Sequence, residues 1–437
     1  MSIDFSQRKY CVEAQKLEIG ENFIAAGWAE EIRNLGKILF IKLRDRSGYL
    51  QVLVTKEDLI KNLEKLPNES VILVSGKIKK SKLKSGDNEL ELEEFQIVSK
   101  ADPKLPIDFS GKIETDLSKR LDWRILDLRN PRNLAIFKIR AKICQAIREF
   151  LTNNGFIEIQ TPKIIGMGAE GGATLFPIKY YDKKAYLAQS QQFYKQMAQL
   201  AGFDRTFEIG PSFRAEVSHT VRHLSEFTHL DVELSFIKNL DDVLKISEGV
   251  LAHAIKFVKE NCKAELKLLN VKLNELKLPL PRISYSEAIK LLQQAGSKIK
   301  HGEDIGTEDE KLLGEVVANK YNSEAYFLYK FPWHLDVCKF YSMREGNFGR
   351  VADLEYKGQE IATNAQREHR YEILKEQIKE KGLKLEDFEF YFEPFKYGAP
   401  PHGGFGMGID RVTQFMLNLQ NIREAVMFPR DPERIAP

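Results

Sequence analysis

The chain has 437 residues, of which 43% are hydrophobic and 30% are charged, and its formal net charge is +3. Its length exceeds what one hydrophobic core usually serves, so two or three domains are expected. Because no run of about 18 apolar residues occurs and the N-terminus lacks an apolar signal core, we expect a cytoplasmic protein without membrane contact.

The cysteines are widely separated and form no CxxC or Cys/His motif: Cys11, Cys144, Cys262 and Cys338. A disulfide framework or a structural zinc site would require closer, paired spacings. The sequence therefore predicts neither.

Residues 18–98 predict β structure. Runs rich in β-forming residues alternate with turn residues at positions 38–43, 49–54, 70–76 and 89–98. One helix is expected at about 56–65. Short strands with one intervening helix are typical of an OB-type β-barrel, which presents one strand face to single-stranded nucleic acid. We therefore expect such a barrel within residues 1–102.

Five lysines and no acidic residue lie between Lys77 and Lys84. This positive charge suits contacts with nucleic-acid phosphates. A solvated hairpin tip would explain the same lysines, and the charge pattern leaves both interpretations open.

Residues 103–133 contain three prolines among charged residues, which predicts a hinge or connector between domains. Beyond it, apolar residues recur at steps of three and four from Ile136 to Phe150, which predicts an amphipathic helix at about 134–154. Later strands and helices alternate without βαβ regularity. The sequence therefore predicts an α+β fold, with an antiparallel sheet flanked by helices, for residues 134–437.

Two strand-like runs, 207–213 and 226–234, flank a polar loop that contains Arg214 and Glu216. A guanidinium suits phosphate oxygens, and a carboxylate suits the exocyclic amine of a base, so this loop is a candidate nucleotide site. A hairpin that carries surface ion pairs is the alternative.

The segment 397–411 is rich in glycine, with four glycines between positions 403 and 408. Glycines allow the backbone to approach a ligand closely. A helix is expected to begin near Ile409 and to carry Arg411. This pattern suits ATP, although it matches neither GxxxxGK[ST] nor GxGxxG, and a structural glycine bend is the alternative.

The block FRAE–RHL–EF–LDVE resembles the second signature motif of class II aminoacyl-tRNA synthetases, and GGFGMGIDR resembles the third. The helix ending in IEIQTP resembles the first motif, whose Pro162 would lie at a dimer interface. The N-terminal barrel matches the anticodon-binding OB domain of the aspartate, asparagine and lysine subgroup. Within that subgroup, YLAQSQQFYKQ and YGAPPHGGFG are similar to aspartyl-tRNA synthetases of the compact archaeal and eukaryotic kind.

The resemblance implies an aspartate–tRNA ligase that activates L-aspartate with ATP and transfers it to the 3′ end of tRNA(Asp). Whether tRNA(Asn) is also a substrate stays open. A homodimer is implied by the family, and an exposed apolar stripe on the helix at 134–154 is expected to support it.

Three alternatives are an asparaginyl-tRNA synthetase, a catalytically silent RNA-binding paralogue and an asparagine-making paralogue, which would lack the barrel. Lys195 argues against the asparaginyl enzyme, because a neutral amide would leave this lysine unpaired.

An anion that attacks a polyanion needs charge neutralisation and alignment more than proton transfer. The resemblance accordingly implies two catalytic arginines, Arg214 at the α-phosphate and Arg411 at the γ-phosphate. The implied ATP-binding set is Arg214, Glu216, Arg222, His223, Glu360 and Arg411. The implied cofactor is Mg²⁺, held by Asp353, Glu360 and Thr363, because carboxylates on paired strands can converge on one hard cation.

The resemblance also implies how the other substrates bind. Lys195 and Arg367 would grip the aspartate side chain, within an aspartate-binding set of Glu170, Gln192, Lys195, Asp231 and Arg367. Anticodon bases would stack on or bond to Phe40, Gln51 and Glu91, as single-stranded RNA usually does with aromatic and polar side chains. Core packing in the barrel is the alternative for Phe40.

The sequence departs from the family pattern at three places. Gln191 replaces a proline, and Asn364-Ala365 replaces two small glycines, which puts the shape of the amino-acid pocket in question. Glu30 and residues 81–83 do not match the positions that separate strict from relaxed choice of tRNA.

Overall fold

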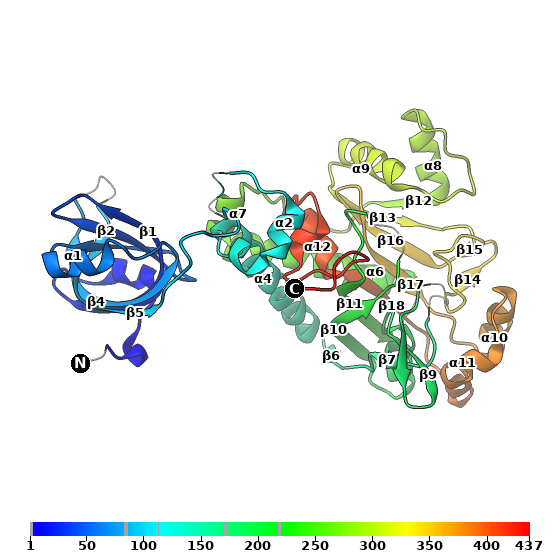
Figure 1. Cartoon of the computed structure of the whole chain (residues 1–437). Coiled ribbons are helices and arrows are strands. Elements are labelled where there is room, and N and C mark those ends of the chain that lie inside the picture. Colours follow the sequence, from blue (N-terminus) through cyan, green and yellow to red (C-terminus); the bar gives the residue numbers. More distant parts are fainter. Residues whose placement is uncertain (1–2, 83–85, 110, 112, 170–173, 217–219) are drawn as a thin grey trace. The chain divides into compact units, whose positions relative to one another are not determined.

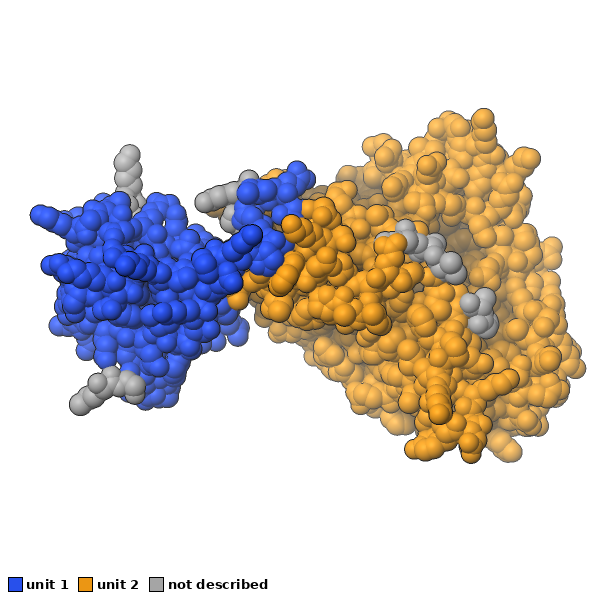
Figure 2. Space-filling view, in the orientation of Figure 1, with its two compact units in different colours: residues 1–115 blue, residues 116–437 orange. Residues whose placement is uncertain are grey.

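The computed structural model describes residues 3–82, 86–109, 111, 113–169, 174–216 and 220–437. These residues form two compact units, Met1–Thr115 and Asp116–Pro437 (Figure 2). The predicted α+β class is confirmed. Within the described ranges, no helix combines the length and the apolar character that a membrane crossing requires.

The first unit is a closed five-stranded barrel with the strand order β1-β2-β3-β5-β4 (Figure 1). β3 and β5 pair in parallel, and the other pairs are antiparallel. This arrangement confirms the predicted OB-type barrel. Its elements are β1 (Asn22–Asn34), β2 (Leu39–Arg44), β3 (Tyr49–Val54), α1 (Glu57–Leu63), β4 (Ser70–Lys80) and β5 (Asn88–Ser99), preceded by the 3-10 helices η1 (Phe5–Gln7) and η2 (Cys11–Lys16).

Alternation along β2 explains how the barrel is filled. Leu39, Ile41 and Leu43 are fully buried in the barrel core, whereas Phe40 and Lys42 are only half-buried. Successive side chains of a strand point to opposite faces, so Phe40 lies on the outer face of the barrel. Its alternative assignment to the barrel core is therefore wrong.

The second unit is built on an eight-stranded sheet (Figure 1). Two edge pairs, β6 with β10 and β12 with β13, are parallel, and the other pairs are antiparallel. In sheet order the strands are β12 (Arg282–Ser284), β13 (Ala325–Tyr329), β16 (Val351–Tyr356), β17 (Glu360–Gln366), β18 (His402–Gly408), β11 (Glu226–Ser235), β10 (Arg205–Phe213) and β6 (Ile157–Glu158).

Helices and short strands surround this sheet. The helices are α2 (Leu117–Asp122), α3 (Arg124–Asp127), α4 (Pro131–Asn153), α5 (Gln192–Leu200), α6 (Leu240–Asn261), α7 (Lys263–Leu269), α8 (Tyr285–Gln294), α9 (Thr307–Tyr321), α10 (Tyr371–Glu380), α11 (Leu385–Phe392) and α12 (Ile409–Met416), with the 3-10 helices η3 (Glu393–Tyr397) and η4 (Ile422–Ala425). The short strands are β7 (Ile164–Ile165), β8 (Pro177–Tyr180), β9 (Lys183–Leu187), β14 (Arg344–Glu345) and β15 (Phe348–Gly349). The stretch expected as a connector contains α2, α3 and the first turn of α4.

Helix α4 begins at Pro131, after Asn130 caps it by accepting a hydrogen bond from the backbone N–H of Arg132. Its apolar stripe, including Ile139, Ile143 and Ile147, is fully buried in the core that α4 forms with α6 and the sheet. The expectation that this stripe is exposed was therefore wrong, because α6 already covers it. The stripe provides no support for a dimer.

Candidate active site

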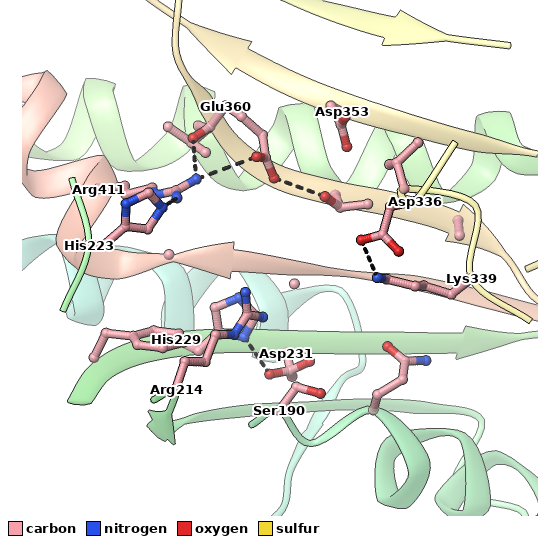
Figure 3. A pocket seen from close by; sticks show the side chains of 18 of the residues that line it. Ser190, Arg214, His223, His229, Asp231, Asp336, Lys339, Asp353, Glu360 and Arg411 are labelled. Carbon is pink, nitrogen blue, oxygen red and sulfur yellow. Dashed lines mark hydrogen bonds and ion pairs between the residues drawn. The ribbon is translucent and has the colours of Figure 1, made fainter. Parts of the chain in front are cut away.

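A cavity of about 440 Å³ lies in the second unit and is lined by residues of the strands β16, β17, β18 and β11 and of the loop between β10 and β11 (Figure 3). It is lined by these predicted site residues: Gln192, Arg214, Glu216, Arg222, His223, Asp231, Asp353, Glu360, Thr363, Arg367 and Arg411. Lys195 is buried beside the cavity and does not line it. Glu170 lies outside the described residues.

One end of the cavity is cationic, and we name it the cationic end after Arg214, His223 and Arg411. The Arg214 guanidinium carbon lies 5.4 Å from the centre of the Phe227 ring. His223 Nε2 lies 3.5 Å from Arg411 Nη2 and 3.6 Å from the Glu216 carboxylate. Burial lowers the pKa of His223, and the nearby arginines lower it further although Glu216 opposes them. This environment therefore favours the neutral imidazole of His223, and an anion bound at this end would favour its protonated form.

Arg411 reaches the cavity because β18 ends at Gly408 and α12 begins directly afterwards. Its Nη1 donates to the Glu360 carbonyl oxygen at 3.1 Å and lies 3.5 Å from Glu360 Oε2. Two of the glycines of β18, Gly404 and Gly406, are required by close packing against β11. A Cβ at Gly404 would lie 2.0 Å from the Val232 carbonyl oxygen.

Arg222 forms hydrogen bonds with residues that lie outside the cavity lining. Its Nη1 donates to Glu310 Oε2 at 2.8 Å and to Gln359 Oε1 at 2.6 Å, and its Nη2 contacts Thr307 Oγ1. The guanidinium thus joins the polar loop to α9 and to the turn before β17. Its predicted contact with ATP stays a prediction.

The candidate metal ligands lie on adjacent strands, as the sequence predicts. Asp353 of β16 is the register partner of Thr363 of β17, and Thr363 Oγ1 donates to Glu360 Oε1 at 2.9 Å. Asp353 Oδ1 is buried without a hydrogen-bond partner among the described residues. Burial and the neighbouring Glu360 raise the pKa of Asp353 well above its ordinary value.

The pKa of Glu360 is shifted in the opposite direction from that of Asp353, chiefly by Arg411. Burial favours the neutral acid, but Arg411 and Thr363 outweigh it and lower the pKa of Glu360. A divalent cation would supply the positive charge that Asp353 lacks, so these residues fit Mg²⁺. Among the described residues no group of three His, Cys, Asp or Glu could hold a metal. Two carboxylates with water or phosphate oxygens are nevertheless an ordinary magnesium site.

The other end of the cavity contains charges that are already paired, and we name it the paired end after Lys195, Asp231, Glu233 and Arg367. Lys195 Nζ lies 2.8 Å from Asp231 Oδ1 and 3.7 Å from Glu233 Oε2. Arg367 donates to the two Glu233 oxygens at 3.0 and 3.2 Å. All four side chains are buried.

This pairing corrects one expectation. A neutral ligand would not leave Lys195 unpaired, because Asp231 already compensates its charge. Glu233 had not been singled out from the sequence. It stands two residues after Asp231 on β11, and the alternation of strand side chains could have placed both on one face.

Besides Asp353, two further polar groups at the cavity lack partners among the described residues. Ser190 Oγ and Gln192 Nε2 are buried, line the cavity and make no hydrogen bond there. Buried polar atoms in folded proteins are nearly always hydrogen-bonded, so these two are candidates to contact a ligand.

Of the departures from the family pattern in this unit, Gln191 and Asn364 do not line the cavity, whereas Ala365 does. Gln191 Nε2 donates to the Pro211 carbonyl oxygen at 3.0 Å. Asn364 Nδ2 donates to the Ala352 carbonyl oxygen at 3.1 Å, on the opposite face of β17 from Thr363 and Ala365, which line the cavity. Gln191 and Asn364 therefore leave the cavity lining unchanged, and Ala365 is the departure that contributes a side chain to it.

The sequence also missed other lining residues. Phe227, Thr228 and His229 follow the polar loop on β11, and Asp410 immediately precedes Arg411. Asp336 and Lys339 form an ion pair of 2.8 Å between the Asp336 carboxylate and the Lys339 ammonium (Figure 3). Because they lie in an irregular loop, no periodicity could have indicated them.

In the barrel, the three predicted anticodon residues lie on adjacent strands. The registers pair Phe40 of β2 with Leu53 of β3, and Leu53 with Glu91 of β5. Gln51 Nε2 donates to Glu89, and Glu91 lies 3.2 Å from Lys79 Nζ. All three predicted residues are half-buried rather than core.

Glu30 lies beside this face. Its carboxylate accepts hydrogen bonds of 2.6 Å from Lys42 and from Arg44, so both of its oxygens are engaged. The Lys42 ammonium lies 3.8 Å from the centre of the Tyr49 ring. The outer face of the barrel therefore combines aromatic, cationic and acidic groups.

The chain is similar to known proteins over almost its whole length. It is 46% identical to the aspartate–tRNA(Asp) ligase of Pyrococcus furiosus, over 96% of this chain and 97% of the relative. It is 45% identical to the aspartate–tRNA(Asp/Asn) ligase of Methanopyrus kandleri, over 96% of each chain. The crystal structure of Pyrococcus horikoshii asparaginyl-tRNA synthetase complexed with asparaginyl-adenylate superimposes with a TM-score of 0.92 at 33% identity, over 98% of this chain and 99% of that one.

Family models match both units. Residues 23–98 match the OB-fold nucleic acid binding domain described as tRNA anti-codon, which covers the barrel strands. Residues 116–432 match the class II tRNA synthetases for D, K and N, which include every strand around the cavity. The cavity, the sheet and these matches together establish that the chain belongs to the class II aminoacyl-tRNA synthetases of the aspartate, lysine and asparagine group.

Proposed function

We propose that the chain activates L-aspartate with ATP and transfers the aspartyl group to tRNA. One observation carries this proposal: the cationic end and the paired end, with Arg214 and Arg367, line one cavity, so a nucleotide and a small charged amino acid can lie side by side. The aspartate–tRNA ligases that resemble the chain along nearly all of its length support the same assignment.

In the first step the α-carboxylate of aspartate attacks the α-phosphorus of ATP, and pyrophosphate leaves with the electrons of the broken P–O bond. Arg214 would neutralise the attacking carboxylate and the α-phosphate, and Arg411 would hold the γ-phosphate. Mg²⁺ at Asp353 and Glu360 would supply further positive charge to the phosphates. Preorganised charge of this kind lowers the barrier without a protein nucleophile.

Selection of aspartate over asparagine would rest on hydrogen-bond direction. Arg367 and Lys195 carry only hydrogen-bond donors; Arg367 lines the cavity, and Lys195 lies buried beside it with Asp231. A carboxylate offers acceptors on both oxygens, whereas an amide would turn its own donor toward these donors. A buried donor left without an acceptor costs about 1–3 kcal/mol, which favours the acid.

We propose that the outer face of the barrel binds the anticodon, with Phe40 stacking on a base and with Gln51 and Glu91 bonding to base edges. The two ligases cited above are almost equally similar to this chain, at 46% and 45% identity. One name nevertheless specifies tRNA(Asp) and the other tRNA(Asp/Asn). Charging of both tRNA transcripts is therefore the experiment that decides between strict and relaxed choice.

We further propose a cytoplasmic homodimer, with the segment around Pro162 at its interface. Pro162 lies between β6 and β7, and Ile157 and Ile164 on either side of it are 49% and 48% exposed. Contiguous exposed apolar patches mark interfaces, and these two isoleucines would contribute to such a patch around Pro162. Multi-angle light scattering tests the assembly, and a monomer would refute the dimer.

Pyrophosphate–ATP exchange with the purified chain tests the activation step. Exchange should require aspartate and Mg²⁺, and EDTA should abolish it. Exchange with asparagine but not aspartate would assign the chain to the asparaginyl enzymes. Exchange with no amino acid would favour the RNA-binding paralogue.

A further inference from the structure

Arg140 of α4 makes contacts at the cavity wall that neither the sequence motifs nor the family assignment explain. Its Nη2 donates to Asp410 Oδ1 and to Thr228 Oγ1, both at 2.7 Å. Asp410 Oδ2 in turn accepts from the backbone N–H of Thr228, also at 2.7 Å. The three residues form a closed hydrogen-bonded triangle, which we name the Arg140 clamp.

The clamp ties together the two backbone segments that build the cationic end. Thr228 follows Phe227, whose ring lies against Arg214, on β11. Asp410 precedes Arg411 in the first turn of α12. A shift of Asp410 relative to Thr228 would change the spacing between the Phe227 ring and the Arg411 guanidinium.

The burial of the clamp makes its hydrogen bonds specific. The side chain of Asp410 is 2% exposed and that of Arg140 is 23% exposed. Burial raises the pKa of Asp410, while Arg140 and the Thr228 N–H act in the opposite direction and favour the carboxylate. Removal of Arg140 would leave a buried acid with one backbone donor in place of a full set of partners.

We propose that Arg140 is a positioning residue for the nucleotide: it sets the distance between the Phe227 ring and Arg411, and thereby the affinity for ATP. This inference rests on the proposed function only in taking ATP as the ligand of the cationic end. Arg140 itself does not line the cavity, so it acts through Thr228 and Asp410.

A merely structural ion pair would predict something different. If Arg140 only fastened α4 to α12, its loss would lower stability and would leave the ratio of the two substrate affinities unchanged. The paired end contains Asp231, three residues beyond Thr228 on β11, and Arg367, which follows β17. Within the described residues, no hydrogen bond or ion pair joins either of them to Arg140, Thr228 or Asp410. The ratio of KM for ATP to KM for aspartate therefore separates the two roles.

The experiment compares Arg140→Ala, Arg140→Lys and Asp410→Asn with the wild-type chain, and measures both KM values by pyrophosphate exchange. Arg148→Ala is the matched control, because Arg148 lies two turns further along α4 and pairs with the surface residue Glu158 at 3.0 Å. Binding of a non-hydrolysable ATP analogue with Mg²⁺, measured by calorimetry, gives a second readout that needs no amino acid.

We expect Arg140→Ala to raise the KM for ATP and the Kd for the analogue at least about tenfold, with the KM for aspartate within about twofold of wild type. Arg140→Lys should recover part of the affinity, and Arg148→Ala should match wild type. Equal changes in both KM values, or an unchanged Kd in a folded Arg140→Lys or Asp410→Asn variant, would overturn the proposal. Absence of aspartate-dependent exchange in wild type would instead refute the proposed function, and the analogue titration would still test the clamp.

Discussion

Glu233 of β11 and Arg367, which directly follows β17, form a buried ion pair with two hydrogen bonds, of 3.0 and 3.2 Å, across the intervening strand β18. Glu233 therefore fixes the plane of the guanidinium and occupies two of its donors. The donors that remain have a defined direction, as bidentate pairing of arginine requires. The Arg367 guanidinium at the paired end is thus oriented before any ligand enters.

Replacement of Lys195 by Met should abolish aspartate activation and leave the affinity for the ATP analogue unchanged. The buried acids Asp231 and Glu233 would lose a cation, so the free energy of unfolding should fall by about 3–5 kcal/mol. Pyrophosphate exchange and thermal denaturation measure the two effects. Lys195→Arg retains the charge if the Met variant does not fold, and Lys245→Met, at a surface ion pair of α6, is the control. Unaltered aspartate kinetics in the Met variant would contradict the assigned role.

Asn364→Ala should leave the KM for aspartate within about twofold of wild type, because Asn364 lies on the face of β17 away from the cavity. The variant loses one hydrogen bond to Ala352 and also removes Asn364 Oδ1, which has no partner in the described part of the chain. These effects oppose each other, so the free energy of unfolding should change by less than about 1–2 kcal/mol. A large change in the aspartate KM would mean that the far face of β17 shapes the pocket.

Asp353→Asn should raise the Mg²⁺ concentration needed for half-maximal exchange by at least about tenfold, because an amide oxygen carries no net charge to bind the cation. Asp336→Asn is the control, since Asp336 also lines the cavity but its side chain is 90% exposed and paired with Lys339. A magnesium titration of both variants measures the difference. Equal shifts would show that Asp353 contributes only general negative charge.

The stability of the second unit should fall as the pH drops below about 6.5, partly through His402. Burial lowers the pKa of His402 below its ordinary value of 6.5, with Glu233 acting against this shift and Arg367 adding to it. The folded chain then keeps the imidazole neutral where the unfolded chain protonates it. The resulting stability is full above pH 6.5 and is lost as the pH falls toward the lowered pKa, by at most about 1.4 kcal/mol per pH unit.

Thermal denaturation of wild type and His402→Gln from about pH 8 to about pH 5 isolates this effect. The wild-type melting temperature should fall more steeply than that of the variant, because His223 and His369 titrate in both. Parallel curves would mean that His402 does not take up the proton.

Phe40→Ala should weaken tRNA binding and leave pyrophosphate exchange intact. Stacking of a base on an aromatic side chain contributes about 1–3 kcal/mol, so the KM for tRNA should rise at least about fivefold. Phe5→Ala is a matched control, since Phe5 is an exposed aromatic residue of η1 outside the strands. Equal losses in charging and exchange would indicate that Phe40 has a structural role.

Local sequence patterns were sufficient to predict much of the fold. The period of two in β2 and the period near 3.6 in α4 each located an element within about three residues, because both report directly on burial. The strand β1 was less apparent from the sequence, since Gly27 and the adjacent acidic residues Glu30 and Glu31 interrupt its alternating pattern. Gly27 is required there because a Cβ would lie 2.2 Å from the Arg44 carbonyl oxygen.

Contacts between side chains that are far apart in the chain could not be predicted from the sequence. The contact of Lys195 with Asp231 depends on how α5 packs against β11, and the Arg140 clamp depends on where α4 crosses the start of α12. No periodicity within one element encodes such contacts. The direction of the α4 stripe was misjudged for the same reason, because only the position of α6 decides which face of α4 is covered.

The glycines of β18 have a practical meaning for inhibitor design. Any side chain at Gly404 would collide with the main chain of β11, and one at Gly406 would meet the His229 ring at 2.4 Å, which Asp231 anchors through a 2.7 Å hydrogen bond. A compound that lies against Gly406 would contact a position where any added side chain must displace the anchored His229 ring. Resistance to such a compound would have to arise elsewhere, from the cavity's other walls or from altered uptake.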